Sequence, residues 1–244
     1  MKCVILQPAY IPWRGYFDQI ANADVFVFFD DVQYDRRGWR NRNRIKTALG
    51  ARWLTIPVHS RGVQIEHTPI NQIEIAWDKP WNEDHLHSLQ SAYGRAPFFK
   101  QYFPLLIDYY NRKPALLADF TIDFTIALSR ELGISTTRFL RSSSLNGKGA
   151  KTDRLISILK ELGADHYISG PAARNYIEKE KFDRAGIRLE YMVYDYPEYN
   201  QLYPPFDPQV TILDLLFMTG ADALRNIQAQ PKSSTAEDMH GFSK

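Results

Sequence analysis

The most constraining feature of this 244-residue sequence is a strand, a helix and a second strand predicted within its first thirty residues. Residues 3–6 form a short apolar run that ends at a Gln-Pro pair, and residues 25–29 form a second run that ends at Asp30 and Asp31. Between them, residues 13–23 carry apolar side chains at helical spacing. Because strands joined by a crossover helix pair in parallel, this unit predicts a parallel sheet covered by helices.

The alternation of strands and helices continues along the chain and predicts one α/β domain over residues 1–230. Residues 81–131 are helical in three stretches, broken at proline, which predicts a helical insertion at about 81–132. Further strands are predicted at 53–58, 136–140, 166–169 and 188–193, and further helices at 155–162, 171–179 and 210–227. We therefore expect an open, mostly parallel, Rossmann-like (nucleotidyltransferase-like) three-layer sheet, with a flexible polar tail at 231–244.

Composition excludes several classes of protein. With 44% hydrophobic and 24% charged residues, the chain is neither disordered nor fibrous. One cysteine, Cys3, rules out a disulfide framework and is expected to be a small core side chain. The apolar run at the N-terminus is too short for a signal peptide or a membrane span, so we expect a cytoplasmic protein.

The loop after the first predicted strand, residues 7–17, places two prolines around aromatic residues just before a helix. Such a loop is rigid, and the free N–H groups of a helix N-terminus attract anions. The alternative is a structural turn whose aromatic side chains are core. The candidate substrate-binding residues here are Gln7, Tyr10, Trp13 and Tyr16.

The loop after the second strand begins with Asp30 and Asp31 and continues to Lys46. Adjacent carboxylates can hold a cation or move a proton, so both are candidate catalytic residues. Six cations within residues 36–46 leave a net charge of −4 on the rest of the chain, which favours one compact anion over a long polyanion. The alternative is a solvated charge run. The candidate substrate-binding residues here are Gln33, Arg37, Trp39, Arg40, Asn41, Arg42 and Arg44.

Two later loops also follow predicted strands and precede helices. Residues 142–152 fail the P-loop pattern, yet Lys148, Lys151 and Thr152 could bind an anion at a helix start, with a plain solvated loop as the alternative. Ser169 and Gly170 open the next loop. Ligands of open α/β sheets bind outside the carboxyl ends of the strands, so all four loops are expected to share one rim.

The histidines predict no metal site. His85 and His87 are two residues apart and cannot face one ion from the same side of a helix. His85 is a candidate general base, with an ordinary surface histidine as the alternative. No nucleophilic triad is recognisable.

The two N-terminal loops, together with ISGPAA at 168–173 and YPEY at 196–199, resemble the WbqC-like protein family from residue 1 to about 220. That resemblance implies a role in bacterial surface polysaccharide (O-antigen) biosynthesis, with glycine transfer as the reaction. Residues 23–27 and Gln33-Tyr34 also resemble nucleotidyltransferases and pantothenate-synthetase-like ligases, but the two histidines of those enzymes are absent and residues 7–13 replace that motif.

Three functions follow as hypotheses. The first is an acyl or aminoacyl transferase, or an ATP-dependent amide ligase, acting on an amino-sugar nucleotide. The second is a nucleotidyltransferase, and the third is a non-catalytic module that binds nucleic acid or another anion. The expected partner is a phosphorylated small molecule or nucleotide sugar rather than a nucleic acid or a membrane. ATP or another nucleotide with Mg²⁺ stays open as cofactor, and the sequence indicates no oligomeric state.

Overall fold

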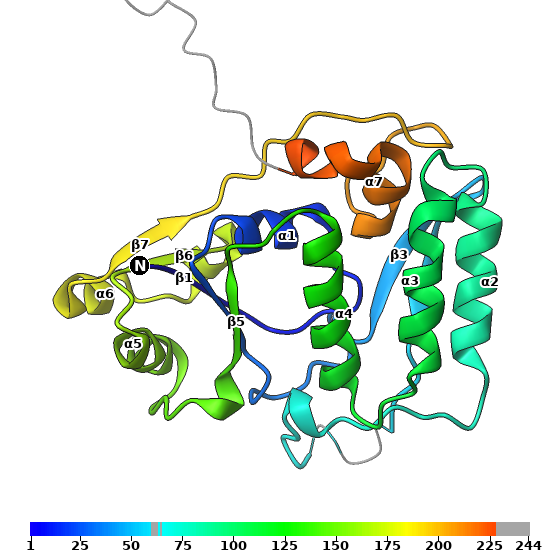
Figure 1. Cartoon of the computed structure of the whole chain (residues 1–244). Helices are drawn as coiled ribbons and strands as arrows, with labels where there is room; N and C mark the ends of the chain where they lie inside the picture. The colour runs from blue at the N-terminus through cyan, green and yellow to red at the C-terminus, as the bar shows by residue number, and fades with distance from the viewer. Residues whose placement is uncertain (60–62, 64, 228–244) are drawn as a thin grey trace, which may run out of the picture.

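The computed structural model describes residues 1–59, 63 and 65–227, which form a five-stranded sheet, a separate two-stranded hairpin and the helices around them (Figure 1). The predicted tail at 231–244 lies outside the described residues. The strands are β1 (Lys2–Leu6), β2 (Val25–Phe28), β3 (Arg42–Thr47), β4 (Gly50–Thr55), β5 (Arg138–Arg141), β6 (His166–Ser169) and β7 (Arg188–Tyr191). The α-helices are α1 (Arg14–Ala21), α2 (Trp81–Tyr93), α3 (Phe99–Asn111), α4 (Leu117–Glu131), α5 (Lys151–Leu162), α6 (Lys179–Ala185) and α7 (Ile212–Thr219). Short 3₁₀ helices are η1 (Ile70–Gln72), η2 (Ser142–Ser144), η3 (Pro171–Asn175) and η4 (Gly220–Asn226).

The sheet has the strand order β5-β2-β1-β6-β7, and every neighbouring pair is parallel. This confirms the predicted α/β class with a mostly parallel, Rossmann-like sheet. The chain first winds from β1 toward β2 and β5, and then returns past β1 to β6 and β7. In a doubly wound sheet, such a reversal leaves a crevice outside the carboxyl ends of the two central strands, here β1 and β6.

Alternate strand residues face opposite sides of the sheet, and two hydrophobic cores result. Val4, Phe26, Phe28 and Ile168 belong to the larger core, which includes α1 and α4. Cys3, Ile5, Val25, Val27 and Tyr167 belong to the smaller core, which includes α5 and α6. Figure 1 shows α5 and α6 on one side of the sheet and α1 and α4 on the other. Cys3 is a core residue, and burial raises the pKa of its thiol to about 12.

The connection from β2 to β5 contains the β3-β4 hairpin and then α2, α3 and α4, which lie within the predicted helical segment. In the described part of the chain, no helix combines the length and apolar character that crossing a bilayer requires. The helix predicted at 171–179 is instead the short η3 followed by α6.

Strand β3 corrects the sequence interpretation, which treated residues 30–46 as one loop. Asparagine, arginine and lysine favour strands weakly, so this segment has no strand signal of its own. Cross-strand pairing with β4 supplies the missing stabilisation, because Arg44 lies directly opposite Trp53 and its guanidinium sits 5.9 Å from that ring. Asn43 and Ile45 point to the other, buried face of the hairpin.

Gly163 ends α5 with a left-handed φ of +69°, and an added Cβ there would meet no atom within 4 Å. Only the backbone conformation therefore opposes a side chain. We expect Gly163→Ala to lower the free energy of unfolding by about 1 kcal/mol, and Gly163→Asn to lower it less, because asparagine tolerates this conformation better. Urea unfolding of the two variants measures both values, and an unchanged midpoint for the alanine variant would contradict the assignment.

Candidate functional site

A cavity of about 800 Å³ lies at the carboxyl ends of β1 and β6, where the winding of the chain reverses. We call it the switch-point cavity. Its apolar wall consists of Ile5, Leu6, Phe29, Leu155 and Tyr167. Its polar wall consists of Gln7, Arg40, Lys151, Asn175, Tyr176 and Glu178. The volume lies within the range of small-molecule sites in proteins.

Arg40 brings a positive charge to this cavity. Its Nη1 donates a hydrogen bond to the Pro8 carbonyl oxygen at 3.0 Å. Among the described residues Arg40 forms no ion pair, and its Nε is buried without a hydrogen-bond partner. Burial lowers the pKa of the Arg40 guanidinium, yet an arginine starts so far above neutrality that it stays charged. The Asp35 carboxylate acts on this charge from a distance but does not pair with it directly. A half-buried cation without a direct ion pair favours an anionic ligand.

Lys151 is the second cation of the switch-point cavity and the first residue of α5. Its φ of +51° is left-handed, a conformation that costs a non-glycine residue about 1 kcal/mol or more. The N-terminus of α5 adds the partial positive charge of the helix dipole. Thr152 is buried, and its hydroxyl accepts a hydrogen bond from the Glu178 N–H at 3.2 Å. The chain after η3 is thereby tied to the start of α5.

The loop between β1 and α1 is fixed by hydrogen bonds from side chains. Tyr16 donates its hydroxyl proton to the Gln7 carbonyl at 3.1 Å. Asn43 on β3 donates to the carbonyls of Tyr10 and Ile11, at 3.1 and 2.8 Å. Ile11 is buried and has a φ of +40°, which is strained for a β-branched residue. Asn43 thus holds a strained loop whose first residue, Gln7, lines the switch-point cavity.

Asp30 and Asp31 lie at the carboxyl end of β2, and their carboxylates are occupied by protein groups. Buried Asp30 accepts hydrogen bonds from the Ser143 N–H at 3.0 Å and the Ser143 hydroxyl at 2.8 Å. The Ser142 hydroxyl lies within hydrogen-bonding distance of both carboxylates. Asp31 also forms an ion pair with Arg154 on α5. Neither carboxylate lines the switch-point cavity, and together they join β2 to β5 and α5.

His85 and Tyr10 lie in the core between the helices and the β3-β4 hairpin. The Tyr10 hydroxyl is 2.7 Å from His85 Nδ1 and is also hydrogen-bonded to the Tyr110 hydroxyl. The His85 ring packs edge-on against Trp81, with ring centroids 5.1 Å apart. Burial lowers the pKa of His85 to about 4, so its imidazole is neutral at pH 7. The structure therefore does not bring His85 or Tyr10 into the switch-point cavity.

Trp13 and Trp39 line a smaller cavity of about 250 Å³, which we call the aromatic cavity. Its other lining residues are Ala9, Pro12, Asn43 and Gln209. The Trp13 ring lies edge-on to Tyr194 with a centroid distance of 4.9 Å, and the Trp39 ring packs against Trp53 at 5.2 Å.

The other candidate residues are spread over several environments. Arg42 lies with its guanidinium 4.6 Å from the Trp53 ring, so it stacks on the outer face of the hairpin with Arg44. Asn41 is buried and donates to the Ile56 carbonyl at 2.8 Å. Gln33, Arg37 and Lys148 are exposed, Ser169 is buried at the end of β6, and Gly170 follows it beside the Tyr194 hydroxyl.

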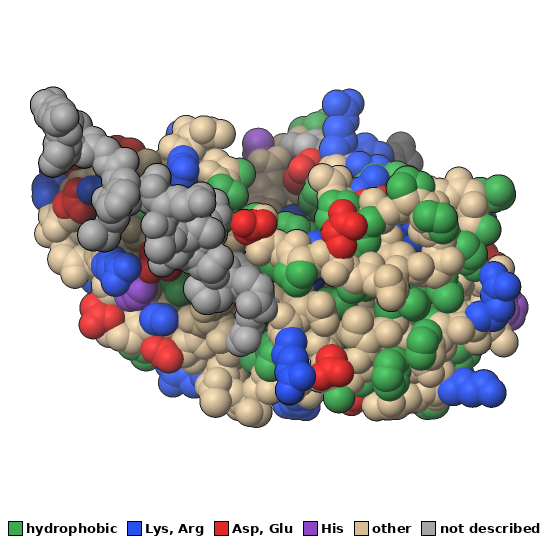
Figure 2. All heavy atoms as spheres, turned by 90° about the horizontal axis from the view of Figure 1, so that it is seen from above, with side chains coloured by type: hydrophobic (Ala, Val, Ile, Leu, Met, Phe, Trp, Pro, Cys, Tyr) green, Lys and Arg blue, Asp and Glu red, His purple; other side chains and the backbone are tan. Residues whose placement is uncertain are grey.

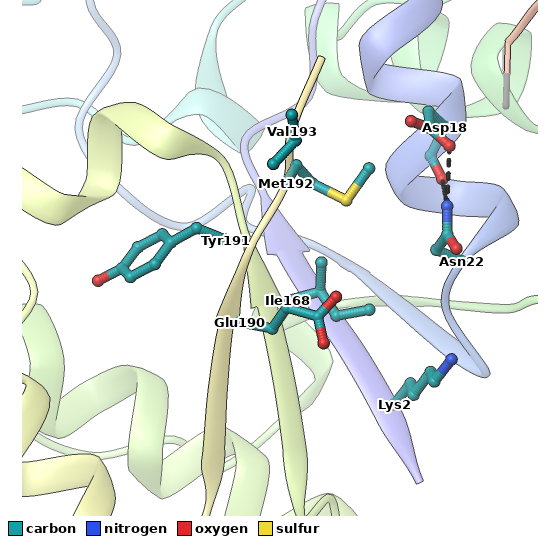
Figure 3. Close-up of a pocket in the computed structure, with 8 residues that line it drawn as sticks. All are labelled: Lys2, Asp18, Asn22, Ile168, Glu190, Tyr191, Met192 and Val193. Atoms are coloured by element: carbon teal, nitrogen blue, oxygen red, sulfur yellow. Dashed lines mark hydrogen bonds between the residues drawn. The ribbon is translucent and has the colours of Figure 1, made fainter. Parts of the chain in front are cut away.

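A third cavity, of about 440 Å³, lies on the face of the sheet beside α1 (Figure 3). In Figure 3, Asp18 on α1 and Asn22, which directly follows α1, stand across from Glu190 on β7, with Lys2 at the start of β1. Burial raises the pKa of Asp18, and its carboxylate accepts hydrogen bonds from Asn22 at 2.8 Å and the Tyr196 hydroxyl at 2.7 Å. Within the described ranges, no three His, Cys, Asp or Glu residues form a group that could hold a metal ion.

Sequence reasoning missed several polar residues that line these cavities or flank them, among them Asn175, Tyr176, Glu178, Arg154 and Gln209. Tyr176 and Glu178 follow the loop at 169–174 by a few residues, so extending that loop would have found them. Arg154 lies one helical turn after Lys151. Gln209 comes from a segment that no motif marks.

Comparisons with known proteins give a family match and a relative of similar length. The family model described as the WbqC-like protein family matches residues 7–226. The chain is 39% identical over 230 residues to the uncharacterized protein Rv1507c of Mycobacterium tuberculosis (strain ATCC 25618 / H37Rv). That alignment covers 91% of this chain and 95% of the relative. No solved structure gives a significant match.

The bonding of Asp30 predicts a structural role. In Asp30→Asn, an amide N–H₂ or a neutral oxygen replaces a carboxylate that accepts from several donors. We expect the free energy of unfolding to fall by about 2–4 kcal/mol, because buried donors lose a charged acceptor. Asp195→Asn is the control, since Asp195 is exposed and such changes usually stay within about 0.5 kcal/mol. Equal stability of the two variants in urea unfolding would contradict this role.

The lowered pKa of His85 predicts that stability depends on pH. Between about pH 6.5 and pH 4, the unfolded chain binds a proton at this histidine that the folded protein does not, so stability falls as the pH falls. The full effect is about 3 kcal/mol. His85→Asn should flatten the pH dependence of the free energy of unfolding over that window, whatever its stability at pH 7. Parallel curves for the variant and the wild type would contradict the prediction.

Proposed function

This chain belongs to the WbqC-like protein family, and we propose that its switch-point cavity binds a nucleotide-linked or otherwise phosphorylated small molecule as substrate of a group-transfer reaction. The observation that carries the proposal is Arg40, a half-buried cation with no direct ion pair among the described residues, in the same cavity as Lys151 and the N-terminus of α5. Two side-chain cations and a helix N-terminus are the groups that proteins use for phosphate.

The remaining lining residues suit a nucleotide. Tyr176 is 66% exposed and offers a ring face on which a base could stack. Gln7 and Asn175 supply amide donors and acceptors, and the apolar wall around Phe29 and Leu155 excludes water from part of the ligand. This combination is typical of a small-molecule pocket with a few convergent polar groups.

For the reaction we propose transfer of an acyl or aminoacyl group, such as glycyl, to the amino group of a nucleotide-linked amino sugar in bacterial surface polysaccharide biosynthesis. The amine nitrogen attacks the activated acyl carbon, the acyl carrier leaves with its electron pair, and a carboxylate takes the amine proton. Glu178 is the carboxylate of the switch-point cavity, and its Oε1 lies 3.0 Å from Lys181 Nζ. A free amino acid as donor would need activation by ATP with Mg²⁺.

A long nucleic acid fits the charge distribution less well. Figure 2 shows acidic and basic side chains interspersed over one face of the molecule, and no continuous basic track crosses it. Arg42 and Arg44 stack on Trp53, and the chain as a whole carries a net charge of only +2. A polyanion needs several aligned cations, whereas one phosphate group needs only the pair in the cavity.

The test measures ligand binding through the melting temperature, because a ligand that binds only the folded state raises it. We expect a nucleotide sugar to raise the melting temperature of the wild type, and Arg40→Met to weaken binding by about tenfold or more through loss of a charged hydrogen bond. Arg37→Met is the matched control, because Arg37 lies in the same loop but is exposed.

Two results would contradict the proposal. The first is equal binding by Arg40→Met and the wild type. The second is tight binding of a single strand of about twenty nucleotides at roughly 0.15 M salt, together with no binding of a phosphorylated small molecule from a set that includes ATP with Mg²⁺.

A further inference from the structure

The aromatic cavity and the switch-point cavity share one wall. Arg40 lines the switch-point cavity, and its neighbour Trp39 lines the aromatic cavity. In the loop between β1 and α1, Gln7 lines the switch-point cavity and Ala9 lines the aromatic cavity. Two hydrogen bonds join these segments, from Arg40 to the Pro8 carbonyl and from the Tyr10 N–H to the Trp39 carbonyl, each 3.0 Å long.

Residues that are adjacent or nearly adjacent in sequence line different cavities, so the two cavities are neighbours. Consecutive Cα atoms are about 3.8 Å apart, so the step from Arg40 to Trp39 is short compared with a sugar nucleotide. A ligand whose phosphates meet Arg40 could therefore place its next group beside the two indole rings.

Both indole rings are held in place before any ligand binds. Trp13 lies over Gly15 so closely that an added Cβ at position 15 would come within 2.3 Å of the ring. Tyr194 holds the same ring edge-on. Trp39 is 43% exposed and packs against Trp53 at 5.2 Å. Fixed aromatic side chains bind a ligand with little loss of conformational entropy.

The lining chemistry selects the kind of group that fits. None of the residues that line the aromatic cavity carries a charge, so a phosphate would find no counter-charge there. A pyranose ring has an apolar C–H face, which an indole covers, and a rim of hydroxyl groups. Gln209 is suited to donate hydrogen bonds to these hydroxyl groups. Its Oε1 already accepts a hydrogen bond from Arg44 at 3.0 Å, whereas its amide N–H groups remain as donors.

We infer that the aromatic cavity is the sugar subsite of the proposed substrate, with the ring between Trp13 and Trp39 while the phosphates lie at Arg40. This assignment rests on the proposed function, because it places the sugar relative to a phosphate in the switch-point cavity.

The experiment compares two probes by isothermal titration calorimetry. They are uridine or thymidine diphosphate, whichever raises the melting temperature more, and the corresponding hexose conjugate. In the wild type we expect the hexose to tighten binding about tenfold, the contribution of one good aromatic contact. In Trp39→Ala that gain should disappear while the affinity for the free diphosphate stays at the wild-type value. Trp39→Phe should keep part of the gain.

Tyr176→Ala is the matched control, because Tyr176 is also exposed but lines the switch-point cavity. This variant should weaken both probes by the same factor. The inference is overturned if the hexose gain persists in Trp39→Ala, or if Trp39→Ala weakens both probes equally; in either case the proposed phosphate site still stands. If the free diphosphate does not bind the wild type at all, both proposals fail, so the two failures are distinguishable.

Discussion

The reversal of winding between β1 and β6 is the constraint on which the site depends. The two strands are parallel and in register, with Val4 beside Ile168, so their carboxyl ends stop at the same edge. The chain then leaves β1 toward α1 on one face and leaves β6 toward α6 on the other. The switch-point cavity lies where these segments depart, and its lining includes Gln7 after β1 and Asn175 after β6. The cavity is thus a consequence of topology, and its chemistry comes from the loops.

The carboxylates at the end of β2 illustrate how charge can serve architecture. Asp30 is separated from Ser142 and Ser143 by more than a hundred residues, and its hydrogen bonds join the ends of two parallel strands. Arg154 pairs with Asp31 and also lies 5.4 Å from the Phe29 ring, which is part of the cavity wall. Because Arg154 is one turn from Lys151 on α5, this ion pair fixes the helix whose first residue carries the cavity's second cation. In the structure, the carboxylates that the sequence proposes as catalytic therefore hold in place a helix that lines the cavity.

The limits of sequence prediction follow from where each signal lies. Apolar runs predicted the strands of the parallel sheet, because buried strands carry their own signal. Strand β3 carries no such apolar signal, yet its position determines which arginines line the switch-point cavity. Arg40 precedes the hairpin and lines the cavity, whereas Arg42 and Arg44 lie on the outer face of the hairpin. Tyr10 and His85 are 75 residues apart, so no local pattern could show that each buries the other. The roles assigned to the candidate site residues stay predictions.

The segment between β7 and α7 shapes the aromatic cavity without lining the switch-point cavity. Figure 1 shows this segment crossing back above α1. Arg14 on α1 anchors it: its guanidinium lies 4.7 Å from the Tyr196 ring and donates to the Pro197 carbonyl at 2.8 Å. Tyr199 continues the anchor through a hydrogen bond of 2.8 Å to buried Asp214 on α7. The YPEY motif at 196–199 thereby fixes the course of the chain that brings Gln209 to the aromatic cavity, so a motif that lines no pocket still determines the shape of one.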